Sequence, residues 1–509
     1  MPRHPARSHS PAHAPLAPHW LPAALLGSLL GPLLAGCMSL APSYQAPPLP
    51  VADRYDAAVA ETQGTTTTPA AEVSWQSYFQ DPAMRGLIGT ALANNRDLRV
   101  AVLRVEEARA AYAIRRADLF PTVGLQADGT RARTPGDLNL SGRPLTASQY
   151  QVSLGAASWE LDFWGRVRNL KDAALENYLA TDAARRAFTL SLVGEVADAY
   201  LTLREYDERL ALTRQTIASR GESLRIFRRR YEVGAISKLD LTQVETLYEQ
   251  AQALGAQLEQ TRAQQAHALE LLVGTPLALP PASERLDDDA VQRDLPAGLP
   301  AELLDKRPDI VAAEHQLRAA NANIGAARAA FFPQVTLTGA FGTASAELDG
   351  LFTGPSRAWS FAPSISLPIF DAGRRRAGLD LAEVRRDQAV ATYERTVQAA
   401  FRDVSDALAA RYWLARQVAT LGATVKAQGE RERLARLRYD HGASPFLEVL
   451  DAQRDLLSAQ QQFVQTRRAL ISSRVALYTA LAGGIGTLDA APEDVASTLS
   501  ATPHADATP

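Results

Sequence analysis

The sequence predicts a mainly α-helical protein with a few transmembrane β-strands, built from two tandem repeats of a β-hairpin and a long coiled-coil helical hairpin. Three observations support this fold class. Long stretches without proline carry apolar residues spaced alternately four and three apart, which is the pattern of a coiled-coil seam. Short segments alternate apolar with small polar residues, as β-strands do. The same motifs also occur twice along the chain, which indicates duplication of a whole domain.

Composition excludes several classes of function. The 509 residues are 46% hydrophobic and 21% charged, and the net charge is −3. A weakly negative chain offers no basic field for nucleic acid, so no nucleic-acid partner is expected. No two histidines share a helical face at metal-ligand spacing, and no phosphate-binding glycine loop occurs. We therefore expect no catalytic residues, no metal site, no cofactor and no enzyme activity.

The N-terminus predicts a lipoprotein signal peptide over residues 1–36. A basic start is followed by an apolar stretch at 21–34 that is short for a membrane span. The letters LAGC then end at Cys37, the only cysteine, and resemble a bacterial lipobox. We expect lipid attachment at Cys37, followed by an extended tether over 37–72 that has no core of its own. The alternative is a free cysteine after an ordinary signal peptide.

The repeat is clearest in two stretches, RRYEVGAISKLDL from Arg229 to Leu241 and LRYDHGASPFLEV from Leu437 to Val449. Gly234 and Gly442 occupy the same place in them, and 442 minus 234 gives an offset of 208 residues. Further upstream, Lys306 to Ile310 matches Asn94 to Leu98 at an offset of 212. A period of this length indicates two copies of one domain rather than a solenoid.

We expect repeat 1 over residues 73–275, repeat 2 over 296–485, and a disordered tail over 486–509. Each repeat is expected to contain two strands followed by two long helices. The predicted strands are 121–131 and 148–162 in repeat 1, and 333–343 and 357–370 in repeat 2. The predicted helices are 165–232 and 237–273 in repeat 1, and 374–440 and 445–482 in repeat 2.

The expected strands have one apolar face and one small polar face. Trp359, Phe361 and Ile365, for example, alternate with serines at 360 and 364. About ten alternating residues suit a tilted membrane strand. Four strands leave open edges that lipid does not tolerate, so closure requires strands from other subunits. A small soluble sheet is the alternative.

The repeated motif is predicted to be the turn that joins two antiparallel helices. Gly234 and Gly442 are expected to end the first helices in the left-handed conformation. Ser237 is expected to cap the next helix of repeat 1, and Ser444 the helix that begins at Pro445.

Several segments, in this order after the lipobox, resemble one family. They are WQSYFQDPAMRGLIGTALANNRD from Trp75, KRPDIVAAE from Lys306, FFPQ from Phe331, RYDHG from Arg438 and LEVLDAQ from Leu447. Over about residues 73–485 the chain resembles the outer membrane factor family, the TolC/OprM-like class that includes NodT-type efflux outer-membrane lipoproteins.

The resemblance implies a homotrimer with a 12-stranded β-barrel and a 12-helix periplasmic α-barrel. It implies a lipid-anchored protein of the bacterial outer membrane, extending into the periplasm, that is the passive exit duct of a tripartite efflux system. Small molecules would be driven by an inner-membrane pump of the RND type through a periplasmic membrane-fusion adaptor. Two alternatives are an exit duct for protein secretion and a coiled-coil lipoprotein scaffold without a channel.

The resemblance also implies functional residues near the second turn. A periplasmic gate is expected at Leu447, Glu448 and Asp451, where three copies of each acid around an axis would favour cations. The alternative is that both acids are solvated coiled-coil positions. Tyr439 on one hairpin and Asp240 on a neighbouring hairpin are expected to form a latch that holds the tips closed.

The two exposed turns are the expected contacts for the adaptor, because rigidly placed loops are where partners bind. The alternative is that the turns contact nothing. The predicted contact residues are Val233, Gly234, Ala235 and Ile236 in the first turn, and His441, Gly442, Ala443 and Ser444 in the second.

Overall fold

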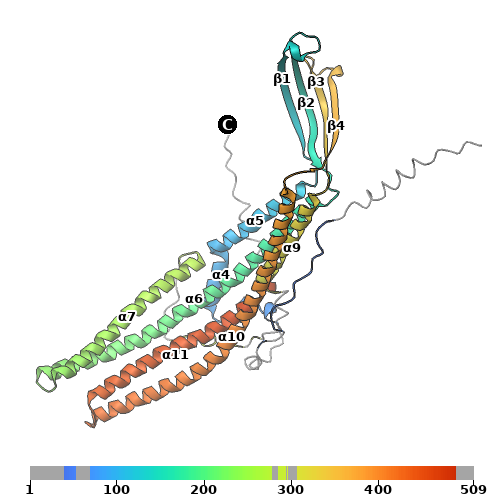
Figure 1. Cartoon of the computed structure of the whole chain (residues 1–509). Helices are drawn as coiled ribbons and strands as arrows, with labels where there is room; N and C mark the ends of the chain where they lie inside the picture. Colours follow the sequence, from blue (N-terminus) through green and yellow to red (C-terminus); the bar gives the residue numbers. More distant parts are fainter. Residues whose placement is uncertain are drawn as a thin grey trace, which may run out of the picture. The chain divides into compact units, whose positions relative to one another are not determined.

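The computed structural model describes residues 39–52, 55, 69–277, 285–293, 295 and 306–488. Cys37 and most of the expected tail therefore lie outside the described residues. The chain divides into two compact units, whose elements are labelled in Figure 1. The first unit contains residues up to 42, 115–171 and 322–382, and the second contains 43–114, 172–321 and the chain from 383 onward.

The helices occur in pairs of matching length, one from each repeat. α5 (Arg96–Ala117) and α9 (Pro308–Ala329) each have 22 residues, and α6 (Arg166–Glu232) and α10 (Arg374–Asp440) each have 67. α7 (Lys238–Val273) has 36 residues and α11 (Phe446–Ala480) has 35. The shorter helices are η1 (Ala70–Glu72), α3 (Trp75–Tyr78), α4 (Pro82–Asn94), η2 (Gly136–Leu138), η3 (Gly354–Ser356) and α12 (Ile485–Leu488).

Two long helical hairpins and two β-hairpins thus confirm the predicted fold class. Within the described part of the chain, every helix is too short or too polar to cross a membrane.

One hydrogen bond between helices occurs at equivalent positions in both repeats. In repeat 1, Asn95 Nδ2 donates to the Leu272 carbonyl at 2.8 Å, which ties the start of α5 to the end of α7. In repeat 2, Arg307 Nη1 donates to the Ala480 carbonyl at 3.1 Å. Arg307 lies 212 residues after Asn95, and Ala480 lies 208 after Leu272, so the tie is the same in both copies. The two sequence offsets therefore identify structurally equivalent positions.

The four strands form one antiparallel sheet in the order β1-β2-β3-β4. The strands are β1 (Val123–Thr134), β2 (Leu145–Glu160), β3 (Gln334–Ser345) and β4 (Arg357–Ser366). The hairpins of the two repeats join through β2 and β3. Among the described residues, the outer edges of β1 and β4 pair with no strand.

The sheet has the two chemically different faces that the alternation predicts. Leu125, Leu154, Phe341 and Trp359 are paired in one row across all four strands, so their side chains share a face. The adjacent row, on the other face, contains Gly124, Gly155, Ala340 and Ser360. One face is therefore apolar, and the other is small and polar.

The last strand is shorter than the expected 357–370, because it ends at Ser366. Pro368 has no N–H to donate to a ladder and so disfavours continued pairing. Leu367, Ile369 and Phe370 follow the strand as exposed apolar residues.

Glycines on the polar face allow the strands to approach closely. A Cβ atom at Gly342 would lie 2.0 Å from the Val152 carbonyl oxygen, and one at Gly155 would lie 2.4 Å from the Gly339 oxygen. Real Cβ atoms do not approach backbone this closely, so neither position admits a side chain without backbone movement. The crowding therefore falls on the small polar face of the sheet.

The core of the second unit forms where α3 and α4 pack against the long helices. The rings of Tyr78 and Tyr478 stack at 4.3 Å, and the Tyr478 hydroxyl donates to the Val73 carbonyl at 2.8 Å. Burial raises the pKa of both tyrosines. A Cβ at Gly483 would lie 2.3 Å from the Tyr478 ring, so glycine is required beside it.

The segment that follows Cys37 is held by side-chain contacts that the tether prediction did not include. Its residues 39–52 contain no helix or strand. The Tyr44 hydroxyl donates to Glu314 at 3.0 Å, and Arg318 lies over the Tyr44 ring. Burial, followed by the Glu314 carboxylate, raises the pKa of Tyr44 to about 12. Further along, the Tyr55 ring stacks on Phe401 at 5.1 Å.

Replacing Gly342 with alanine tests the glycine requirement. We expect Gly342→Ala to destabilise the protein by about 1–3 kcal/mol, since the added methyl group overlaps backbone. Gly124→Ala is the matched control, because a Cβ there has no atom within 4 Å. The thermal unfolding midpoint of the purified protein in detergent is the measurement. Equal midpoints for the two variants would contradict the requirement.

Candidate functional site

The turns of the two helical hairpins have the same backbone geometry. Gly234 has φ 74° and Gly442 has φ 70°, so both adopt the left-handed conformation predicted from the sequence. In the first turn, Ala235 N donates to the Arg230 carbonyl at 2.8 Å and Gly234 N to the Tyr231 carbonyl at 2.9 Å. Ala443 and Gly442 repeat both bonds in the second turn, with Arg438 and Tyr439. This pair of bonds is a Schellman motif, which satisfies the last carbonyls of each helix.

The helices after the turns begin differently. Ser237 caps α7 as predicted and forms a capping box, in which the Asp240 carboxylate accepts from Ser237 N at 3.1 Å. The prediction that Ser444 caps α11 is wrong. Pro445 occupies the N-cap position, and no side chain caps this helix. The Ser444 hydroxyl is buried without a hydrogen-bond partner among the described residues.

The two hairpins contact each other close to their turns. The Phe446 ring lies 4.5 Å from Phe227 and 4.8 Å from Tyr439, measured between centroids. Arg230 of α6 donates a hydrogen bond to the Tyr439 hydroxyl of α10. A buried cluster of Leu224, Phe227, Leu241, Val244 and Leu450 extends this contact. The hairpins are thus joined by an apolar contact with one polar bond at its margin.

The expected gate residues are accessible in the first turns of α11. The Leu447 side chain is 45% exposed. Glu448 pairs with Arg438 at 3.5 Å, and Asp451 pairs with Arg454 at 3.2 Å. Exposed pairs of this kind contribute only about 0–1 kcal/mol. Each acid therefore has an arginine partner, Arg438 or Arg454, which the sequence analysis did not include among the gate residues.

The two expected latch residues do not meet within one chain. Asp240 is engaged in the capping box of α7, with its carboxylate 2.7 Å from the Ser237 hydroxyl. The Tyr439 hydroxyl accepts from Arg230 instead. The sequence interpretation missed Arg230, and its only signal was the Arg-Tyr pairing repeated in the two turns.

The residues of the turns differ in accessibility. Val233, Gly234, Ala235, Gly442 and Ala443 are exposed, whereas Ile236 packs against the apolar cluster. His441 is also exposed, and its Nδ1 lies 2.8 Å from the Leu437 carbonyl. Because a carbonyl only accepts, Nδ1 carries the proton in this contact.

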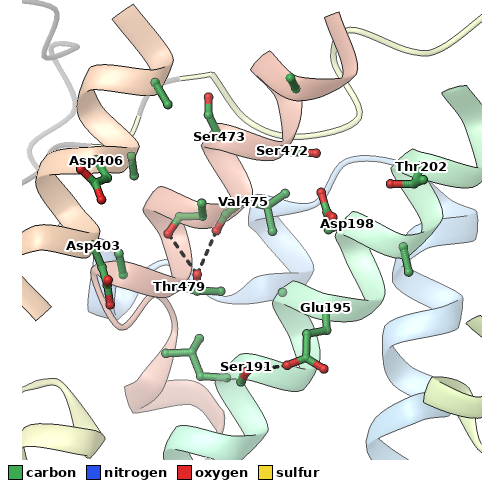
Figure 2. A pocket seen from close by; sticks show the side chains of 18 of the residues that line it. Ser191, Glu195, Asp198, Thr202, Asp403, Asp406, Ser472, Ser473, Val475 and Thr479 are labelled. Carbon is green, nitrogen blue, oxygen red and sulfur yellow. Dashed lines mark hydrogen bonds between the residues drawn. The ribbon is translucent and has the colours of Figure 1, made fainter. Parts of the chain in front are cut away.

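A further acidic site was not predicted. A cavity of about 1050 Å³ lies between α6, α10 and α11, and Figure 2 shows its lining. Glu195 and Asp198 come from α6, and Asp403 and Asp406 come from α10. Arg307 is at its margin, bonded to Asp309 at 2.6 Å and to Asp403 at 3.4 Å. Although burial acts to lower it, these partners raise the pKa of Arg307.

The lining does not resemble a metal site. Among the residues that the structure describes, no three His, Cys, Asp or Glu side chains are grouped to hold a metal ion. The acids form two pairs, each three residues apart, one on α6 and one on α10. The sequence gives no signal that these two pairs, about 200 residues apart in the chain, line the same cavity.

Comparison with known proteins identifies the family. Residues 87–275 and 299–483 match the family described as Outer membrane efflux protein. The chain belongs to this family. It is an outer-membrane channel protein of efflux systems, not an enzyme, and the predictions of family, fold class and general function are confirmed. The alternative of a scaffold without a channel is therefore wrong.

Individual relatives are similar over most of their length. The chain is 46% identical to the outer membrane protein OprJ of Pseudomonas aeruginosa, over 89% of this chain and 94% of the relative. It is 46% identical to the solvent efflux pump outer membrane protein SrpC of Pseudomonas putida, over 89% of this chain and 96% of that protein. The open state of the MtrE outer membrane channel of Neisseria gonorrhoeae superposes with a TM-score of 0.79 at 40% identity, over 88% of this chain and 99% of MtrE.

Replacing Tyr439 with phenylalanine tests the contact between the hairpins. Losing one hydrogen bond costs about 1 kcal/mol, so amide exchange in the first turn of α11 should rise about fivefold. Tyr231→Phe is the matched control, because Tyr231 is the repeat equivalent and its hydroxyl makes no hydrogen bond among the described residues. Hydrogen–deuterium exchange with mass spectrometry is the measurement. Equal exchange in both variants would show that the Arg230–Tyr439 bond contributes nothing.

Proposed function

We propose that the chain forms a homotrimeric exit duct, with a 12-stranded β-barrel in the outer membrane and a 12-helix barrel in the periplasm. Small molecules pass through it passively, driven by an inner-membrane pump of the RND type through a periplasmic membrane-fusion adaptor. The four-stranded sheet with two unpaired outer edges carries this proposal. Three such sheets joined edge to edge supply twelve strands and leave no edge exposed to lipid.

The chemistry of the sheet supports a water-filled lumen. The row from Leu125 to Trp359 gives one face the apolar side chains that suit lipid. The opposite face carries glycine, alanine, serine and glutamine, which suit water and discriminate little between solutes. Choice of substrate would therefore rest with the pump and adaptor. The solvent efflux named for SrpC supports small organic molecules as the cargo.

We assign lipid attachment to Cys37, which would anchor the chain in the outer membrane. Two residues later, the Ser39 hydroxyl donates to Asn169 at 2.8 Å. Arg328 donates to the Leu40 carbonyl at 3.4 Å. All four residues belong to the unit that carries the sheet. Because only one residue separates Cys37 from Ser39 in the sequence, its acyl chains would be held near the membrane strands.

The turns are proposed as the adaptor contact, and the first turns of α11 as the gate. The exposed backbone of both turns is rigidly held by the Schellman bonds, which suits docking. Leu447, Glu448 and Asp451 of three subunits would form the constriction, with the acids favouring cations. Asp240 of one subunit and Tyr439 of its neighbour would form the latch. When the gate closes, the Tyr439 hydroxyl would lose its hydrogen bond with Arg230 and bond to this Asp240 instead.

Single-channel recording in planar bilayers tests the gate. We expect Asp240→Ala combined with Tyr439→Phe to raise conductance about twofold or more, because the latch no longer holds the constriction closed. Ser237→Ala is the control, since it removes the capping box but keeps the Asp240 carboxylate. Unchanged conductance in the double variant would rule out the latch.

In the same assay Asp451→Asn should reduce the preference of the channel for cations, because the variant lacks the carboxylate. An unchanged preference would remove Asp451 from the gate.

Metabolic labelling with palmitate tests the anchor. Wild-type protein should incorporate label, and Cys37→Ser should incorporate none, because the thiol is the only acceptor the chain offers. Ser39→Ala, which keeps the thiol, is the control. Labelling of the Cys37→Ser variant would overturn the assignment.

A further inference from the structure

The basic residues of the four strands all lie on one face of the sheet. Arg131 and Arg133 belong to β1 and Arg357 begins β4, whereas β2 and β3 contain no arginine or lysine. Side chains alternate between the two faces along a strand. Arg131 and Arg133 follow Leu125 by six and eight residues, and Arg357 precedes Trp359 by two. The three arginines therefore share the apolar face with Leu125 and Trp359.

The arginines also lie at one end of the sheet. Residues 135–144 connect β1 to β2 at this end, and residues 346–356 connect β3 to β4 (Figure 1). We call it the turn end. At the opposite end, the helix end, β2 is followed by α6 and β4 by α10. The apolar face thus becomes basic only toward its turn end.

Arginines at the two ends differ in their partners. Near the helix end, Arg166 pairs with Glu160 at 2.6 Å, and Arg375 pairs with Asp371 at 2.6 Å. At the turn end, all three strand arginines are exposed, and among the described residues their side chains have no ion pair or hydrogen bond. The loops there contain three acids, none of which pairs with these arginines, namely Asp137, Glu347 and Asp349. The basic groups at the turn end are therefore available to an external anion.

Aromatic residues lie between the apolar and the basic parts of this face. Trp359 is 77% exposed and is the next residue on the same face after Arg357. Tyr150 is paired with Gly129, two residues before Arg131. Tryptophan and tyrosine concentrate where a membrane protein passes from hydrocarbon to headgroups. The order of apolar, aromatic and basic residues therefore follows the polarity of a membrane surface.

The length of the apolar surface places the arginines beyond the hydrocarbon. Arg357 is eight residues from Ile365, which corresponds to about 26 Å of strand and roughly 20 Å of height at the usual tilt. Exposed Leu367 and Ile369 continue the apolar surface toward the helix end. Membrane barrels have an apolar band about 25 Å tall. Arg357 thus lies at the edge of such a band, where headgroups begin.

We propose that Arg131, Arg133 and Arg357 bind the phosphate groups of a phosphorylated glycolipid in the outer leaflet of the outer membrane. A guanidinium group donates two parallel hydrogen bonds to phosphate, which suits it to this ligand. The site continues the lipid-facing apolar row, so that one lipid would bury its acyl chains beside Trp359 and its phosphates beside the arginines. The inference rests on the proposed function, which places the turn end outside the cell.

Closure of the barrel would bring the two groups of arginines together. β1 and β4 are the edge strands of the sheet. In the proposed trimer, β4 of one copy pairs with β1 of the next. Each boundary would then carry Arg357 of one copy and Arg131 and Arg133 of its neighbour on the lipid-facing side. Three guanidinium groups match a glycolipid that bears more than one phosphate.

Native mass spectrometry of the full-length protein in detergent, titrated with diphosphoryl lipid A, tests the site. Arg131→Gln/Arg133→Gln should weaken binding about tenfold or more, and adding Arg357→Gln should weaken it further. Arg131→Lys/Arg133→Lys should lose less, because the charge remains. A loss as large as that of the glutamine variant would attribute the effect to altered structure and overturn the inference.

The matched control removes two exposed arginines near the helix end. Arg116→Gln/Arg374→Gln should bind diphosphoryl lipid A as tightly as the wild type, because the outer leaflet lies at the other end of the strands. An equal loss in this control would overturn the assignment to the turn end. Equal affinity of the wild type and the Arg131→Gln/Arg133→Gln variant would leave the arginines only as charges that protect edge strands from unwanted pairing.

Two further probes identify the ligand. Lipid A stripped of both phosphates should bind the wild type about tenfold more weakly, and equal affinity would contradict phosphate recognition. Inorganic phosphate should not displace diphosphoryl lipid A at equal concentration, because it lacks the acyl chains. Displacement would show a site for free phosphate and overturn the lipid.

Single-channel conductance of the same samples separates this inference from the proposed duct. The arginines are on the face away from the proposed lumen, so Arg131→Gln/Arg133→Gln should conduct as the wild type does. Normal conductance with unchanged lipid A binding would overturn the lipid site and leave the duct intact. A wild type that forms no channel would overturn the duct itself.

Discussion

The open backbone edges of β1 and β4 are the constraint on which the rest of the structure depends. Each edge presents N–H and C=O groups that must be paired if the sheet lies in lipid. One chain supplies only four strands, too few to close on themselves. The proposed closure by further copies of the chain would account for the apolar outer row and for the close strand approach at Gly155 and Gly342. It would also account for the uncovered face of α5, in which Leu98 is the one residue buried within the described chain, since a partner that closed the barrel would bring its own helices.

Duplication explains why many features occur in both repeats. The two repeats also differ at equivalent positions, and these differences separate their roles. Asn95 and Arg307 make the same tie to the end of a helical hairpin, but only Arg307 also lines an acidic cavity. Ser237 fixes the start of α7 with a capping box, whereas α11 begins at Pro445 without one. The second hairpin, which bears the proposed gate residues, thus has the less firmly capped helix beside its turn.

Much of the fold could be predicted because each element has a local signal. Heptad spacing predicted the long helices, and the alternation of apolar with small polar residues predicted the two faces of the strands. Gly234 and Gly442 predicted the turns. Contacts that depend on tertiary packing had no such signal, and these include the Arg230–Tyr439 bond and the docking of Tyr44 beside Glu314. The Ser444 cap was mispredicted because Pro445 takes the capping position, leaving Ser444 one residue outside the helix.

Electron imaging of the detergent-solubilised protein, viewed down its long axis, tests the central claim most directly. If edge-to-edge closure by three copies is correct, class averages will show a threefold tube with a lumen and six lobes, one for each repeat. Averages of single rods without a lumen, or of rings with another symmetry, would contradict the account.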